Sequence, residues 1–175
     1  MLFRSGGGGA AAGGGGAAAA GLPNGLPAGQ TALRMFGSLV FVTGQGSGKP
    51  ISILRTGASP SSSLSYVGAI NLTYPGGGWL HPHSALGVRP TPDKPGSCDL
   101  FFQLGSDQNF SNTTRTVTMS SAQVAGANGT LQGESIYKLT LTDNLTNVVA
   151  TNLTRVAKGL RNSAGFAFHP VTRDF

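Results

Sequence analysis

The histidines and the single cysteine are the residues most capable of binding a metal. His81 and His83 are separated only by Pro82, while Cys98 and His169 lie further along the chain. A structural zinc site requires four such ligands, each held by further contacts, and a His-x-His pair alone supplies half of them. We therefore expect no metal site and interpret these histidines as loop residues.

A second motif resembles a phosphate-binding loop. The segment Thr43-Gly44-Gln45-Gly46-Ser47-Gly48-Lys49-Pro50 follows an apolar run, but that motif requires Gly in place of Thr43 and Ser or Thr in place of Pro50. Pro50 has no hydroxyl for magnesium, and the residues after it have a strand pattern. The helix N-terminus that would hold the phosphates is therefore missing, and we expect no nucleotide site.

The remaining titratable groups are too few to suggest catalysis. The chain has three histidines, one cysteine and six carboxylates, and it contains no Gly-x-Ser-x-Gly nucleophile elbow. No two carboxylates have the arrangement that a glycosidase needs. We expect a protein that is not an enzyme, with no catalytic residue and no cofactor.

Two groups of residues are candidates for contact with a partner. The only tryptophan stands next to a glycine run in Tyr74-Pro75-Gly76-Gly77-Gly78-Trp79-Leu80-His81. An exposed Trp79 and Tyr74 would stack on a sugar or anchor a protein contact, with His81 and His83 beside them. The alternative is that Trp79 caps one end of the hydrophobic core.

The second group of candidates is basic. Leu153, Val156, Ala157 and Leu160 recur at helical spacing after Thr151 or Asn152, which predicts one short C-terminal helix. Such a helix would place three cations near its outer face and last turn: Arg155, Lys158 and Arg161. They are either a solvated helix end or a weak nucleic-acid contact.

The composition favours contact with other macromolecules through an uncharged surface. Charged residues make up only 10% of the chain, against about 25% in an average soluble domain. Few charges would have to lose their water at a contact between copies. All six acidic residues lie at or after Asp93, so the first half tolerates a polyanion, but its cations are too sparse for a phosphate-binding stripe.

The chain divides into an arm and a body. Residues 1–32 are rich in Gly, Ala and Pro, and their small side chains bury too little area to offset the entropy of ordering. We predict a disordered arm that can lie along another subunit. No run of eighteen strongly apolar residues occurs, so we expect no membrane span.

Residues 33–175 have the pattern of one all-β domain. Short β-favouring runs alternate with Gly/Pro-rich turns, which predicts an antiparallel sandwich or a jelly-roll-like barrel. A proline-rich segment from Trp79 to Ser97 is expected to be a long connection. The predicted strands are Leu39–Val42, Ile51–Arg55, Leu64–Tyr74, Asp99–Leu104, Thr114–Met119, Ile136–Thr142, Leu145–Thr151 and Ala164–His169.

These features together lead to one principal hypothesis and two alternatives. The general style resembles viral β-barrel and decoration proteins, so we expect a virion structural protein: a capsid decoration or cement protein, a minor capsid protein, or a spike or fibre subunit. Its partners would be copies of itself or a major capsid protein. The alternatives are an extracellular or cell-surface carbohydrate-binding or adhesive module that uses Trp79 and Tyr74, and, more weakly, a nucleic-acid-binding protein.

Overall fold

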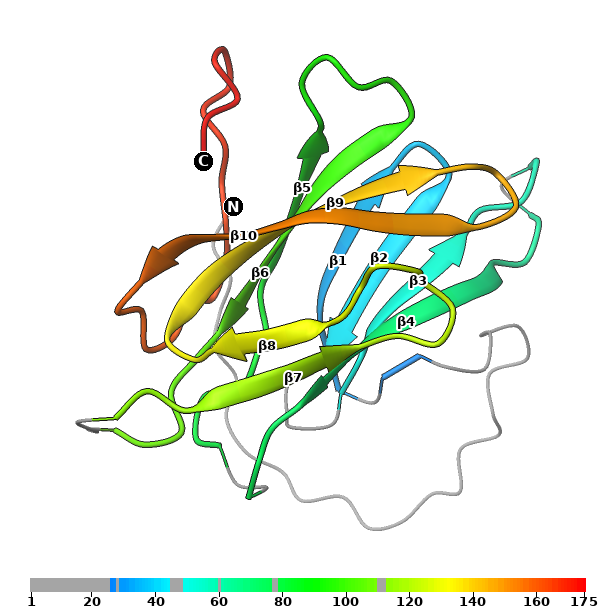
Figure 1. Ribbon diagram of the computed structural model, residues 1–175. Helices are drawn as coiled ribbons and strands as arrows, with labels where there is room; N and C mark the ends of the chain where they lie inside the picture. The colour runs from blue at the N-terminus through cyan, green and yellow to red at the C-terminus, as the bar shows by residue number, and fades with distance from the viewer. Residues whose placement is uncertain (1–25, 28, 45–48, 60, 77–78, 110–112) are drawn as a thin grey trace, which may run out of the picture.

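The chain folds into a sandwich of two antiparallel sheets (Figure 1). A computed structural model describes residues 26–27, 29–44, 49–59, 61–76, 79–109 and 113–175. The first sheet has six strands, in the order β1 (Gln30–Phe36), β2 (Leu39–Gly44), β3 (Ile51–Arg55), β4 (Ser65–Thr73), β7 (Thr116–Ser120) and β8 (Gly129–Gln132). The second has four, in the order β10 (Val148–Lys158), β9 (Ser135–Asp143), β6 (Ser97–Leu104) and β5 (Leu86–Pro90).

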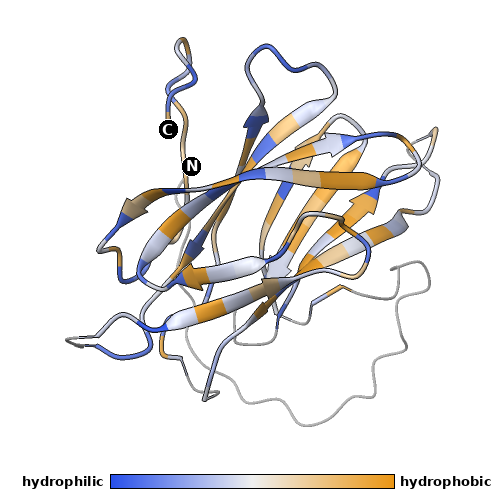
Figure 2. Ribbon diagram, in the orientation of Figure 1, coloured by the Kyte–Doolittle hydropathy of each residue, from blue (hydrophilic) through white to orange (hydrophobic). Residues whose placement is uncertain are grey.

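The predicted all-β sandwich is confirmed, and its core lies between the two sheets. Phe41, Ile53 and Ile70 of the first sheet meet Leu100 and Phe102 of the second. Hydrophobic residues concentrate on the strands and hydrophilic residues in the connections (Figure 2). Alternate residues of each strand point inward, as the period of a pleated strand requires.

Two strands are buried along their whole length, β2 and β6. Their sequences explain this, since Leu39-Val40-Phe41-Val42 and Leu100-Phe101-Phe102 are continuous apolar runs instead of alternating ones. A strand of this kind needs cover on its outer face as well as on the core side. Both sheets therefore have an outer face that is partly covered by other segments of the chain.

The end of the sandwich where β3 and β9 finish is closed by an ion pair. The Arg55 guanidinium donates two hydrogen bonds of 2.7 Å to the Asp143 carboxylate, which joins the two sheets. The hydrogen bond with Arg55 is the main reason that the pKa of Asp143 lies below its usual value, and it also raises the pKa of Arg55. Ser38 accepts a further hydrogen bond from Arg55.

The predicted C-terminal helix is wrong, because β10 continues through Lys158 and pairs with β9. The pairing has two register shifts, one between Thr151 and Thr154 and one between Arg155 and Ala157. Each shift inserts an extra residue and reverses the inside–outside alternation. The apolar residues of the strand therefore recur at irregular intervals that resemble helical spacing.

Other boundaries also differ from the sequence prediction. The proline-rich connection contains β5, an edge strand whose last residue is Pro90, and β8 lies in a segment for which no strand was predicted. The strand predicted over Ala164–His169 is irregular, although Phe166 and Phe168 do pack on the same part of the molecule. β1 begins at Gln30, before the predicted start of the domain, and residues 1–25 of the predicted arm lie outside the described residues.

Candidate interaction surfaces

Tyr74 and Trp79 lie in the core and do not form an exposed aromatic pair. Their side chains are only 5% and 7% exposed, and their rings meet edge to face with centroids 4.8 Å apart. Trp79 also packs on Gly133, where a Cβ atom would come within 2.8 Å of the indole. The alternative interpretation, in which Trp79 caps one end of the core, is therefore the one that the structure supports.

His83 is fully buried beside Tyr74. The Tyr74 hydroxyl accepts a hydrogen bond from the His83 backbone N–H at 3.0 Å and lies 2.8 Å from Nδ1. Because the hydroxyl oxygen accepts this bond, its O–H group is best placed to donate a hydrogen bond to Nδ1. Nδ1 is then the unprotonated nitrogen of a neutral imidazole. Burial lowers the pKa of His83 to about 4, and a backbone hydrogen bond with Lys49 offsets part of this effect.

The potential metal ligands do not converge in the described part of the chain. No group of three or more His, Cys, Asp or Glu side chains is found there. Cys98 is buried in the core, where burial raises the pKa of its thiol to about 12, and the nearby Asp99 and Asp143 carboxylates add to the shift. A thiol with so high a pKa is a poor nucleophile at neutral pH.

The two groups of predicted contact residues meet at one end of the sandwich. The His81 backbone N–H donates to the Ser106 carbonyl at 3.0 Å, and the Ser106 N–H donates to the Arg161 carbonyl at 3.1 Å. Between them, Gly105 leaves no room for a side chain, because a Cβ atom would lie 1.9 Å from the His81 oxygen and 2.7 Å from that of Arg161. This end therefore joins the Trp79–His83 segment to the chain that follows β10.

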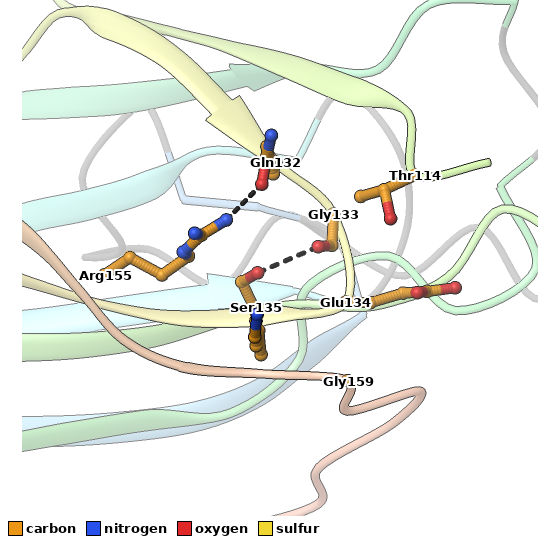
Figure 3. A pocket seen from close by; sticks show the side chains of 8 residues that line it. Thr114, Gln132, Gly133, Glu134, Ser135, Arg155 and Gly159 are labelled. Atoms are coloured by element: carbon orange, nitrogen blue, oxygen red, sulfur yellow. Dashed lines mark hydrogen bonds between the residues drawn. The ribbon is translucent and has the colours of Figure 1, made fainter.

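Two of the three predicted cations line an open pocket of about 360 Å³ near this end. Arg155 donates a hydrogen bond to Gln132, which links β10 to β8, whereas the Glu134 side chain extends away from that pair (Figure 3). The pocket is lined by Thr114, Gln132, Gly133, Glu134, Ser135, Arg155, Lys158 and Gly159. A pocket with two cations and one carboxylate is better suited to bind a single acidic group of a ligand than a run of nucleic-acid phosphates.

The third cation, Arg161, is held by other contacts. Its guanidinium donates to the Asn109 side chain, and its carbonyl accepts the Ser106 N–H. Nearby, Arg115 forms a 3.1 Å ion pair with Asp107. These cations therefore do not form a continuous stripe along one element, which is the arrangement that nucleic-acid backbones usually require.

The outer face of the first sheet carries an apolar row that the sequence analysis missed. Met35 pairs with Val40, Val40 with Leu54, and Leu54 with Tyr66, so the four side chains stand side by side across β1, β2, β3 and β4. We call these four residues the apolar row. The outer face of a solvated antiparallel sheet is normally polar.

The middle of the apolar row is covered and its two ends are not. Val40 and Leu54 are 3% and 0% exposed, whereas Met35 and Tyr66 are 56% and 42% exposed. The cover includes Leu26 and Leu64, which pack on a small cluster formed by Val40, Val42 and Leu54. Leu33 lies next to Met35 on β1 and is also largely exposed. Apolar surface thus reaches the outer edge of the sheet, because β1 is an edge strand.

Comparison with known proteins does not identify the chain. No family model, curated protein or solved structure matches it. Among the described residues there is also no helix that is long and apolar enough to cross a membrane. Its function must therefore be inferred from its own surfaces.

Proposed function

We propose that this protein is a non-enzymatic structural subunit of a virion, which stabilises an assembly through contacts with copies of itself or with a major capsid protein. The observation that carries the proposal is the exposed apolar end of the first sheet, formed by Leu33 and Met35 on the edge strand β1. Exposed apolar residues on a sheet edge favour association with another chain.

The chemistry of the surrounding surface supports this proposal. A contact at β1 would cover apolar side chains and would desolvate few charges, since only 10% of the residues are charged. The buried Asp99 carboxylate has partners inside the fold: it accepts hydrogen bonds from Thr91 and Thr140 and forms ion pairs with Arg89 and Lys138. These groups contact one another and stabilise the sandwich. The surface that remains for contacts between subunits is therefore largely uncharged.

The carbohydrate-binding alternative loses its main support. It required the rings of Trp79 and Tyr74 to face solvent, and both are buried. The nucleic-acid alternative now depends on the cations that line the pocket described above. One of them, Arg155, is already hydrogen-bonded to Gln132. Subunit contact is therefore the function that the surface of the molecule favours most.

The proposal is tested by the mass of the purified full chain, measured by light scattering across a range of concentrations. We expect species larger than a monomer, and we expect the double variant Leu33→Ser/Met35→Ser to shift the distribution towards the monomer. A standard interface buries about 800 Å² on each partner, so the loss of two central apolar side chains should weaken association by about tenfold or more.

The matched control is Val156→Ser. Val156 is an exposed apolar residue on β10, the edge strand of the other sheet. This variant should associate like the unmodified chain. A chain that stays monomeric at every concentration, and that is absent from images and composition of purified native particles, would contradict the proposal.

A further inference from the structure

We propose that four exposed asparagines are acceptor sites for N-linked glycans: Asn71, Asn128, Asn144 and Asn152. The inference goes beyond the proposed function, since it adds a covalent modification and requires the chain to enter the compartment in which glycans are attached. It rests on the sequons of the chain, which are Asn-x-Ser/Thr triplets whose middle residue is not proline, and on where the fold places them.

Sequons are more frequent in this chain than its composition explains. Serine and threonine make up about a fifth of the residues, so the nine asparagines would form about two sequons by chance. The chain contains six, at Asn71, Asn109, Asn112, Asn128, Asn144 and Asn152. The two at Asn109 and Asn112 include residues 110–112, which lie outside the described residues, so we restrict the inference to the other four.

Each of the four sites presents both of its recognition groups to solvent. The asparagines are exposed, and so are the hydroxyl-bearing residues two positions later, Thr73, Thr130, Thr146 and Thr154. On β4 the period of the strand achieves this, because Ile70 and Leu72 are buried while Asn71 and Thr73 are exposed. Attachment of a bulky glycan needs a sequon at the surface, and all four sites meet that requirement.

The other three asparagines lie where the backbone leaves the regular strand pairing. Asn144 lies in the turn between β9 and β10, and Asn128 lies in the connection between β7 and β8. Asn152 lies at a register shift of β10, where it adopts a left-handed conformation with φ of +49°. Asparagine tolerates this conformation better than most residues do. A glycan at these exposed positions would displace no packed side chain.

The chemistry of attachment is compatible with the contacts of these side chains. The asparagine Nδ2 attacks the C1 carbon of a lipid-linked pyrophosphate oligosaccharide. The Nδ2–C1 bond forms, the bond from C1 to the phosphate oxygen breaks, Nδ2 loses one of its two protons, and the lipid pyrophosphate leaves. Because the nitrogen keeps one N–H, Asn144 can still donate its 3.2 Å hydrogen bond to the Asn147 side chain.

The four sites lie in the half of the sandwich that contains β4, β7, β8 and β10. The edge strands β8 and β10 lie together there, since Arg155 donates a hydrogen bond to Gln132. No sequon occurs in β1, β2, β3, β5 or β6. Glycans would therefore leave Leu33 and Met35 on β1 uncovered, and they would add solvation to a chain of which only 10% is charged.

The first test is mass spectrometry of the full chain isolated from its native source, before and after treatment with a peptide-N-glycosidase. We expect a mass above that of the sequence. The enzyme releases each glycan and converts its asparagine to aspartate, so we expect aspartate at the four sites after treatment. A native mass equal to that of the sequence, or asparagine at all four positions after treatment, would overturn the inference. Neither result depends on whether the chain associates.

The second test uses the full chain secreted from eukaryotic cells behind a cleavable signal sequence. Thr130→Ala removes a sequon hydroxyl but keeps Asn128, so we expect the loss of one glycan from the intact mass. The matched control is Thr118→Ala, because Thr118 is the exposed cross-strand partner of Thr130 and belongs to no sequon. This control should keep every glycan. If Thr130→Ala also keeps every glycan, Asn128 is not an acceptor, and a chain that is secreted without glycans would refute all four sites.

Discussion

The two outer faces of the sandwich are covered in different ways. Each sheet has one strand that is buried along its whole length, β2 in the first sheet and β6 in the second. Residues 159–175 follow β10, and we call them the C-terminal strap. Their Phe166, Phe168 and Phe175 cover the outer face of the second sheet around Phe101 and Gly87. Among the described residues, the centre of the outer face of the first sheet is covered by Leu26 and Leu64.

The contacts of the C-terminal strap are numerous and specific. The Phe175 ring stacks on Phe101 with centroids 4.6 Å apart, and Phe168 meets the edge of the same ring at 5.2 Å. The Arg89 guanidinium lies over both Phe101 and Phe168 and donates to the Arg173 carbonyl. Gly87 allows this close approach, since a Cβ atom there would lie 3.1 Å from Phe168.

Among the described residues, this difference distinguishes an outer face that is packed by an aromatic cluster from one that is packed by a few aliphatic side chains. On the second sheet, Phe101 and Arg89 find partners within the strap, although Val156, Val171 and Phe175 stay exposed. On the first sheet, the apolar row ends in exposed side chains at Met35 and Tyr66. Apolar surface that the fold does not cover itself is the surface that a partner can use.

The largest expected effect is that of Phe101→Ala. Phe101 is 1% exposed and is the centre of the strap contacts, so its removal should lower the free energy of unfolding by about 3–5 kcal/mol. The matched variant on the other face is Tyr66→Ala, which removes a half-exposed ring and should lower it by about 1 kcal/mol. Denaturant unfolding measures both values, and similar losses in the two variants would show that the faces are equally well packed.

The second-largest expected effect is a loss of about 3 kcal/mol from the free energy of unfolding when His83 is protonated at low pH. This loss limits the pH range in which the two faces can be compared. The pKa of His83 is about 4 in the folded chain and about 6.5 when unfolded, so the unfolded state binds more protons between these values. Stability should therefore be complete above about pH 6.5 and fall progressively as the pH drops to about 4. A protonated Nδ1 could no longer accept the Tyr74 hydroxyl proton.

His83→Asn provides the control for this pH effect. An Asn side chain keeps an acceptor near the position of Nδ1 but does not titrate, so the variant should be less stable overall, with a flat profile from pH 6.5 to about 4. Thermal unfolding as a function of pH measures the difference. A variant that retains the full slope would show that another group is responsible.

The sandwich could be predicted because its strands carry local signals. Runs such as Leu39–Val42 and Ile51–Arg55 are short, apolar and bounded by glycine or proline, and they form β2 and β3. The strands that were missed lack such a signal. β5 lies among prolines, which an edge strand tolerates, and β8 has only four residues, Gly129–Gln132.

The candidate surfaces were harder to predict, because they depend on contacts between distant residues. The glycine run before Trp79 allows its ring to face either inward or outward, and the packing of that ring on Gly133 decides the outcome. The apolar row depends on the register of four strands, which places Met35 and Tyr66 on one face although they are far apart in sequence. The only local sign of the apolar row is that β1 carries apolar residues at both its inward-facing and its outward-facing positions.

The smallest expected effect on stability is that of Leu26→Ala. Leu26 is only partly buried, so the loss of its side chain should lower the free energy of unfolding by about 1 kcal/mol, well below the effect of Phe101→Ala. Association of the full chain should change little, since the contacts that the structure gives Leu26 lie within its own chain. Light scattering and denaturant unfolding of the same preparation separate the two effects. If association weakens far more than stability, Leu26 also takes part in contacts between copies, which would contradict this expectation.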